Sequence, residues 1–116
     1  MVRLLFQIVT GPENVTKGAL GLLVAKTARE GGHDVNVFLA GDGVDYLRVE
    51  TQQQASGVGT GNVGEHFDAL VAGGARLFAS GMSAAARGIA ADDSVKLVKP
   101  PRLVELIVAA DKVVVY

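Results

Sequence analysis

The stretch LFASGMSAAARG, residues 77–88, runs from a short apolar segment through Ser80-Gly81 into a segment with the composition of a helix. A strand that ends in such a turn and continues into a helix is typical of open α/β folds, which bind ligands at the carboxyl edge of the sheet. The stretch raises the question of what Ser80 does in a chain of 116 residues that contains no cysteine.

Further apolar runs recur along the chain and alternate with segments of helical spacing. The expected strands are 4–9, 35–40, 77–79, 95–98 and 112–116. The expected helices run from Asn14 to Gly31, from Asn62 to Val71, from Ser83 onward and from Pro100 to about Ala110, with a short helix in 44–53 and a polar, Gly-rich mobile loop over 51–61. Continuous apolar strands that alternate with helices predict a parallel sheet covered on both faces. We therefore expect one α/β domain over residues 1–116, a three-layer sandwich with a mostly parallel five-stranded sheet.

The composition excludes several classes of function. The formal net charge is -1 and no Lys/Arg block occurs, so neither nucleic acid nor an anionic membrane is an expected partner. The absence of cysteine excludes disulfides, thiolate metal sites and any persulfide or peroxidatic thiol on this chain, and no metal or other cofactor is expected. The first residues lack a signal-peptide layout and no apolar run approaches the ~20 residues of a membrane span, which predicts a cytoplasmic protein.

A candidate ligand site follows from the expected topology. Right-handed crossovers bring the carboxyl ends of parallel strands to one edge of the sheet, where three turns meet. The candidate ligand-binding residues in these turns are Gly11, Gly41, Asp42, Gly43, Ser80, Gly81, Ser83 and Arg87. Arg87 follows Ser83 by one helical turn and could complete an anion site with free helix N–H groups, or it could be an ordinary solvated or interface arginine. The alternative for Asp42 is to satisfy the backbone of its turn.

Three stretches resemble enzyme motifs, and each lacks a feature that the chemistry of its motif requires. Residues 59–64 match G-x-G-x-x-G, but no buried strand precedes them, so a loop is the better interpretation. Residues 11–17 resemble a phosphate loop, yet Thr16 replaces its second glycine and Pro12 removes a backbone donor. Residues 81–85 are close to G-x-S-x-G, but both histidines precede the serine, and Ser83 is expected to be a helix N-cap instead. No catalytic residue is therefore predicted.

Three longer segments resemble the DsrE/DsrF-like (YchN-like) family. They are LLFQIVTGPENVTKGALGLLVAKTAREGGHDVNVFLAGDGV at 4–44, RLFASGMSAAARGI at 76–89 and LVELIVAADKVVVY at 103–116. The resemblance covers nearly the whole chain and keeps the elements in order. It implies an α/β domain that assembles into trimers or hexamers, with sulfur-relay roles in some members.

The chain departs from that family at Ser80. Sulfur-carrying members have a cysteine at the end of the central strand, in a pattern like V-C-G-S, and a serine hydroxyl there cannot hold a persulfide. The first hypothesis is a non-catalytic, oligomeric DsrE-like protein with a small-molecule or anion-binding pocket. The alternative is a cysteine-less structural subunit that combines with cysteine-bearing paralogous subunits. A third, enzymatic hypothesis would use Ser80 or Asp42 in unidentified chemistry.

Residues 103–110 predict self-association independently of that resemblance. These residues are apolar except for Glu105, so the expected helix has almost no polar face. A helix that is apolar nearly all round must bury its second face, and a small domain has few elements left to cover it. We therefore expect an obligate oligomer in which Leu103, Val104 or Val108 contacts a neighbouring subunit.

Overall fold

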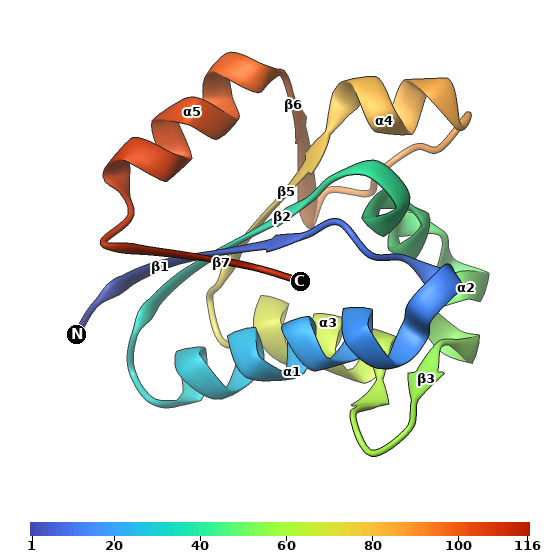
Figure 1. Cartoon of the computed structure of the whole chain (residues 1–116), viewed down its shortest axis with the longest axis horizontal. Helices are drawn as coiled ribbons and strands as arrows, with labels where there is room; N and C mark the ends of the chain where they lie inside the picture. The colour runs from blue at the N-terminus through green and yellow to red at the C-terminus, as the bar shows by residue number, and fades with distance from the viewer.

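The computed structural model describes residues 1–116, and its centre is a five-stranded sheet in which every neighbouring pair of strands is parallel. The strands are β1 (Arg3–Ile8), β2 (Asp34–Leu39), β5 (Arg76–Ser80), β6 (Val95–Val98) and β7 (Lys112–Val115). Their order across the sheet is β6-β5-β2-β1-β7 (Figure 1). The expected α/β sheet is confirmed, and it is parallel throughout.

Helices cover both faces of this sheet, as Figure 1 shows, with α1 and α3 on one side and α5 on the other. The α-helices are α1 (Val15–Glu30), α2 (Val49–Gln54), α3 (Val63–Ala72), α4 (Gly81–Ala86) and α5 (Pro100–Ala109). Two 3-10 helices, η1 (Pro12–Asn14) and η2 (Gly41–Leu47), follow β1 and β2 directly. The three-layer arrangement is therefore confirmed.

The two faces of the sheet differ in how much they bury. Side chains alternate along each strand, so Phe6 and Ile8 face α1 and α3 whereas Leu5 faces α5. The face under α1 and α3 holds a cluster of 20 buried residues, and the face under α5 holds a cluster of 4. The smaller cluster consists of Leu5, Phe38, Phe78 and Leu106. Since α5 is the only helix that contributes a residue to the smaller cluster, Leu106 is its main anchor.

Local signals set the ends of the helices. The Asn14 side chain accepts a hydrogen bond from Lys17 N (3.3 Å) at the start of α1, and the Asn62 side chain accepts one from Glu65 N (3.0 Å) at the start of α3. Gly31 caps the end of α1, and Gly32 follows with a φ of +88°, which only glycine adopts without strain. These positions agree with the sequence prediction.

Three local predictions are wrong. The helix after β5 begins at Gly81, and its N-cap is Ser80 rather than Ser83, because the Ser80 hydroxyl accepts from Ser83 N (3.1 Å) while its own backbone is still extended.

The single short helix expected in 44–53 is split into η2 and α2. Residues 51–61 are not a plain loop: they complete α2 and enter the two-stranded antiparallel sheet of β3 (Ser56–Gly57) and β4 (Gly61–Asn62). Positive φ values at Gly59 and Gly61 make that tight reversal possible.

Membrane insertion has no support among the helices. None of them combines the length and the apolar character that a membrane span needs.

A first prediction concerns the anchor of α5. Leu106 is 4 % exposed and packs with Leu5, Phe38 and Phe78, so Leu106→Ala is expected to lower the free energy of unfolding by about 2–5 kcal/mol. Urea denaturation followed by circular dichroism measures this loss. Leu20→Ala, at a position 38 % exposed on α1, is the control and should cost clearly less. Equal losses for the two variants would contradict the anchoring role of Leu106.

Candidate functional site

The turns after β1 and β2 meet backbone against backbone at the carboxyl edge of the sheet. A Cβ atom on Gly11 would lie 2.1 Å from the Asp42 carbonyl oxygen, and one on Gly43 would lie 2.2 Å from the Ile8 carbonyl oxygen. Both distances are far below any real contact, so glycine is required at these positions for steric reasons. The structure thus brings Gly11, Asp42 and Gly43 together, as the sequence predicted.

A chain of hydrogen bonds joins the third turn to the second. The Ser83 hydroxyl accepts from Gly41 N (3.2 Å), and the Ser80 hydroxyl accepts from Ser83 N (3.1 Å). Gly41 has a φ of +54°, in the left-handed region that favours glycine. Gly81 is not required for steric reasons, because a Cβ there would lie 3.4 Å from the Val98 carbonyl oxygen, an ordinary van der Waals contact. All candidate residues therefore lie in one connected region.

Arg87 spans the gap between α4 and η2. One of its guanidinium nitrogens, Nη2, lies 2.9 Å from Asp42 Oδ1, and the other, Nη1, donates to the Ser83 carbonyl oxygen at 3.4 Å. The Asp42 side chain is 56 % exposed, so the ion pair is open to solvent and contributes about 0–1 kcal/mol to stability. The positive charge at this edge is balanced within the chain, by a carboxylate that water can reach.

A hollow of about 320 Å³ opens beside Pro12, the residue after Gly11, and none of the candidate residues lines it. Its lining comes from η1, the start of α1, and the segment from α2 to β3: Pro12, Val15, Thr51, Gln54, Ala55 and Ser56. No charged side chain lines it, and Thr51, Gln54 and Ser56 supply polar atoms. Sequence reasoning missed this hollow because it assigned residues 51–61 to a loop, and only the packing of α2 and the hairpin against α1 creates its walls.

Tyr46 lies buried in η2 with its hydroxyl beneath the first turn of α1. That hydroxyl has no hydrogen-bond partner, and it lies so close to Gly18 that a Cβ there would be 2.4 Å away. Burial raises the pKa of the Tyr46 hydroxyl to about 12, and the carboxylates of Glu13 and Asp45 add to the rise. Tyr46 therefore stays protonated and fixes η2 against α1.

His66 is another buried polar side chain without full hydrogen bonding. Its Nε2 lies 2.7 Å from the Thr60 carbonyl oxygen, which requires a proton on Nε2, while its Nδ1 has no partner. The ring lies against Gly61 and holds the β3–β4 hairpin on α3. No group of three or more His, Asp or Glu side chains is placed to hold a metal ion.

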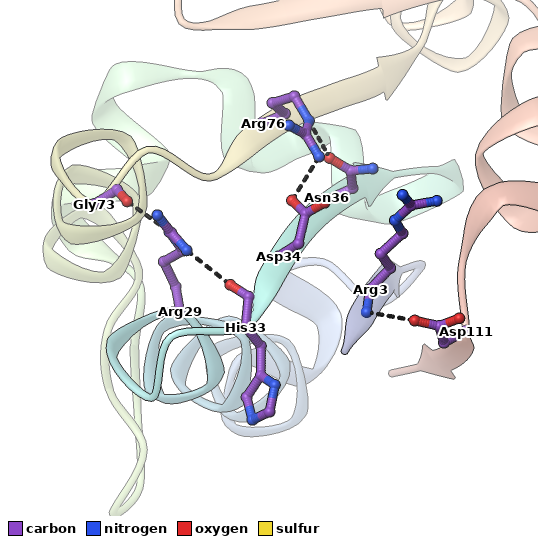
Figure 2. A network of polar contacts seen from close by, with 8 residues as sticks. All are labelled: Arg3, Arg29, His33, Asp34, Asn36, Gly73, Arg76 and Asp111. Carbon is purple, nitrogen blue, oxygen red and sulfur yellow. Dashed lines mark hydrogen bonds and ion pairs between the residues drawn. The ribbon is translucent and has the colours of Figure 1, made fainter. Parts of the chain in front are cut away.

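The opposite edge of the sheet carries a separate polar network, shown in Figure 2. Arg76 donates to Asn36 Oδ1 (2.8 Å) and Asp34 Oδ1 (2.6 Å), which ties β5 to β2. Arg29 donates to the carbonyl oxygens of Gly73 (2.6 Å) and His33 (2.8 Å), next to the ends of α1 and α3. Cations are favourable beside the carbonyl groups at helix C-termini, so this network is structural.

Comparison with known proteins identifies the family of this chain and structures with the same fold. The DsrE/DsrF-like family model matches residues 3–116, so the chain belongs to the DsrE/DsrF-like family. The crystal structure of the YchN protein from E. coli superimposes with a TM-score of 0.85 at 21 % identity and full coverage of both chains. A conserved protein of unknown function from Bacteroides thetaiotaomicron, BT1422, superimposes with a TM-score of 0.69 at 15 % identity over 98 % of this chain and 95 % of its own. No protein with curated annotation matches the chain.

The buried tyrosine gives a prediction for alkaline pH. A raised folded-state pKa means that the contribution of Tyr46 to stability is complete below pH 10 and is lost as the pH rises from about 10 to about 12. Tyr46→Phe removes no hydrogen bond, so it should leave stability at pH 7 within about 1 kcal/mol and show a shallower loss above pH 10. Urea titrations at several pH values measure both effects. Tyr116→Phe is the control, and curves for Tyr46→Phe parallel to wild type up to pH 11.5 would contradict the assignment.

Proposed function

We propose that this chain is a non-catalytic, self-associating DsrE-family protein that binds a small anionic molecule at the carboxyl edge of its sheet. The observation that carries the proposal is the hydrogen bonding of the Ser80 hydroxyl. Its hydroxyl accepts the hydrogen bond of a helix N-cap, and no base lies within hydrogen-bond distance to activate it. The position at which sulfur-carrying relatives are expected to hold a thiol therefore has a structural role in this chain.

The Arg87–Asp42 pair supports the binding of an anion. An exposed ion pair of small net stability exchanges its carboxylate readily for a ligand oxyanion, because both partners are already partly solvated. Arginine also presents several donors in a planar fork that matches carboxylate and phosphate oxygens. We therefore assign the anionic group of the ligand to Arg87, in the place that Asp42 occupies.

The volume of the uncharged hollow beside Pro12 indicates how large the ligand is. Its volume of about 320 Å³ lies at the lower end of the range for small-molecule sites, about 300–1,000 Å³. Thr51, Gln54 and Ser56 offer hydrogen bonds to a neutral polar portion of such a molecule. The ligand proposed is thus small, with one anionic end and a neutral end.

The outer surface of α5 supports self-association, as a trimer or a hexamer. Val104 and Val108 are 57 % and 79 % exposed, and Ile107 beside them is also exposed. Leu103, by contrast, packs inward against the small cluster that contains Leu106. A helix with a second apolar stripe on its solvent side is typical of a surface that a neighbouring subunit covers.

The second candidate function is a structural subunit in a sulfur-relay type hetero-oligomer. The observation that favours it is the same serine at position 80, since a chain without a thiol can assemble with subunits that carry one. Purification from the native host separates the two. A homo-oligomer supports the first function, and stoichiometric co-purification of cysteine-bearing paralogues supports the second.

The anion site is tested by two opposite substitutions. Arg87→Ala should abolish the thermal stabilisation by phosphate and sulfate, which for a site at 100 times its Kd amounts to about 2.7 kcal/mol. Asp42→Asn should enlarge that stabilisation, because it removes the internal competitor of the anion. Arg102→Ala removes a guanidinium on α5 and serves as the control. Equal melting shifts in all four proteins would rule the site out.

The subunit contact is tested on α5. Val108→Asp and Val104→Asp should lower the subunit number measured by light scattering while leaving the circular dichroism spectrum unchanged, because an unpaired buried charge costs several kcal/mol. Leu103→Asp is the contrasting variant and should unfold the chain, since its side chain packs on the small cluster. A monodisperse wild-type monomer at micromolar concentration would contradict the proposal.

A further inference from the structure

The two edge strands of the sheet differ in how they are protected. An edge strand exposes unpaired N–H and C=O groups, and charged residues or prolines normally keep it from pairing with another chain. The edge strand β6 has Lys96 within it, Lys99 directly after it and Pro100 next. The other edge strand, β7, reads KVVVY from 112 to 116 and has no charge or proline after Lys112. The edge at β7 therefore has one charge, at its first residue, and is unprotected from Val113 onward.

The free backbone groups of β7 belong to Val113 and Val115. The N–H of Tyr116 donates to the Gln7 carbonyl oxygen (2.9 Å), and the Tyr116 carbonyl oxygen accepts from Val9 N (2.8 Å), so both groups of Tyr116 face β1. Backbone groups alternate in direction along a strand, which turns those of Val114 toward β1 as well. The N–H and C=O groups of Val113 and Val115 then point away from β1, in the plane of the sheet, where no strand accepts or donates hydrogen bonds.

The side chains at this edge are apolar on both faces. Val114 and Tyr116 pack against the large cluster under α1, so Val113 and Val115 lie on the opposite face of the strand. Val113 is 41 % exposed and Val115 is 58 % exposed. Exposed β-branched side chains in an edge strand favour pairing with a second strand, because each valine then packs against a cross-strand neighbour.

We propose that β7 pairs antiparallel with β7 of a second copy of this chain, about a two-fold axis that passes through Val114. In this register Val113 lies opposite the partner's Val115, and Val115 lies opposite the partner's Val113. Both residues present their N–H and C=O groups outward, so each opposite pair exchanges two hydrogen bonds. Val114 lies opposite its own copy, as a pair without hydrogen bonds. The two sheets become one continuous sheet.

Self-complementarity identifies a second copy as the occupant. The outward N–H and C=O groups are arranged symmetrically about Val114. Each donor on one copy therefore meets an acceptor on an identical copy, and each acceptor meets a donor. No charged residue follows Lys112, and Lys112 itself lies opposite the partner's Tyr116, so no like charges meet across the pair. The four exposed valine side chains of the two copies form one patch on the α5 face and cover one another.

The surface beside β7 can add apolar area to such a contact. A stable interface buries about 800 Å² per partner, more than a short strand pair supplies alone. On the α1 face an apolar hollow of about 550 Å³ lies between β1 and α1, and its walls include Leu4 and Phe6, the residues in register with Lys112 and Val114 of β7. A two-fold axis normal to the sheet places both hollows on the same face of the joined sheet, on either side of the paired strands. The pairing therefore encloses apolar side chains beyond β7 itself.

This contact goes beyond the proposed function, because it lies at β7 rather than on the outer stripe of α5 and needs neither the anion site nor that stripe. A chain with both contacts has two different surfaces for assembly. A two-fold contact at β7 would join pairs of subunits, whereas the α5 surface can join others.

The natural absence of cysteine gives a direct test of the register. Val114→Cys places a single thiol on the two-fold axis, where the Cα atoms of a pair without hydrogen bonds lie about 4.5 Å apart, within the range of a disulfide. Mild oxidation should convert Val114→Cys into a covalent dimer that a reductant reverses. Val113→Cys and Val115→Cys are the controls: their like pairs lie about 7–8 Å apart and should not cross-link alone, whereas an equimolar mixture of the two should. Cross-linking of Val113→Cys as fast as Val114→Cys, or no cross-linking of Val114→Cys, would overturn the proposal.

A charge reversal separates this contact from the one on α5. In the Val108→Asp background, V113K/V115K places lysine opposite lysine and should convert a dimer into a monomer in light scattering. V113K/V115E carries as many charges but places lysine opposite glutamate, so the dimer should persist. If Val108→Asp leaves the wild-type subunit number unchanged, the α5 contact fails while the β7 test still applies. Equal subunit numbers for V113K/V115K and V113K/V115E would overturn the β7 pairing.

Discussion

The backbone contact between the turns after β1 and β2 is the constraint on which the candidate site depends. Gly11 lies against the Asp42 carbonyl group and Gly43 lies against that of Ile8, with no room for a Cβ at either place. This contact fixes the start of η2, and η2 in turn holds Asp42 where Arg87 can reach it from α4. A side chain at either glycine would separate the turns and move every polar group at the carboxyl edge. The chemistry of the edge therefore rests on two residues that have no side chain.

The unequal covering of the sheet has a second set of consequences. Two long helices and the turns around Tyr46 bury one face, whereas α5 alone lies on the other and is held by a small cluster around Leu106. One helix cannot cover five strands, so valines of β7 remain exposed beside it, and the outer side of α5 is apolar as well. In a domain of 116 residues this exposed apolar surface is what a second copy of the chain can bury.

Membership in the DsrE/DsrF-like family and the chemistry of this chain have to be kept apart. The family match and the structural likeness to YchN describe the same arrangement of strands and helices. Fold alone does not carry an activity, because activity depends on the groups at the site. At position 80 the group is a serine hydroxyl that caps α4, so the architecture is shared while a thiol-based step has no residue to perform it.

The sequence by itself determined the architecture, since the alternation of apolar strands with capped helices is a local signal read within each segment. Asn14, Asn62 and the glycines after α1 and α3 act on neighbouring residues, and their roles were therefore predictable. The N-cap at Ser80 instead of Ser83 was not, because two serines close together compete and the direction of the incoming strand decides between them. Only the tertiary structure paired Arg87 with Asp42, built the hollow beside Pro12, and left the backbone of Val113 and Val115 unpaired. Each of these depends on which segments lie side by side, and the order of strands across a sheet is set by long-range packing that no local pattern encodes.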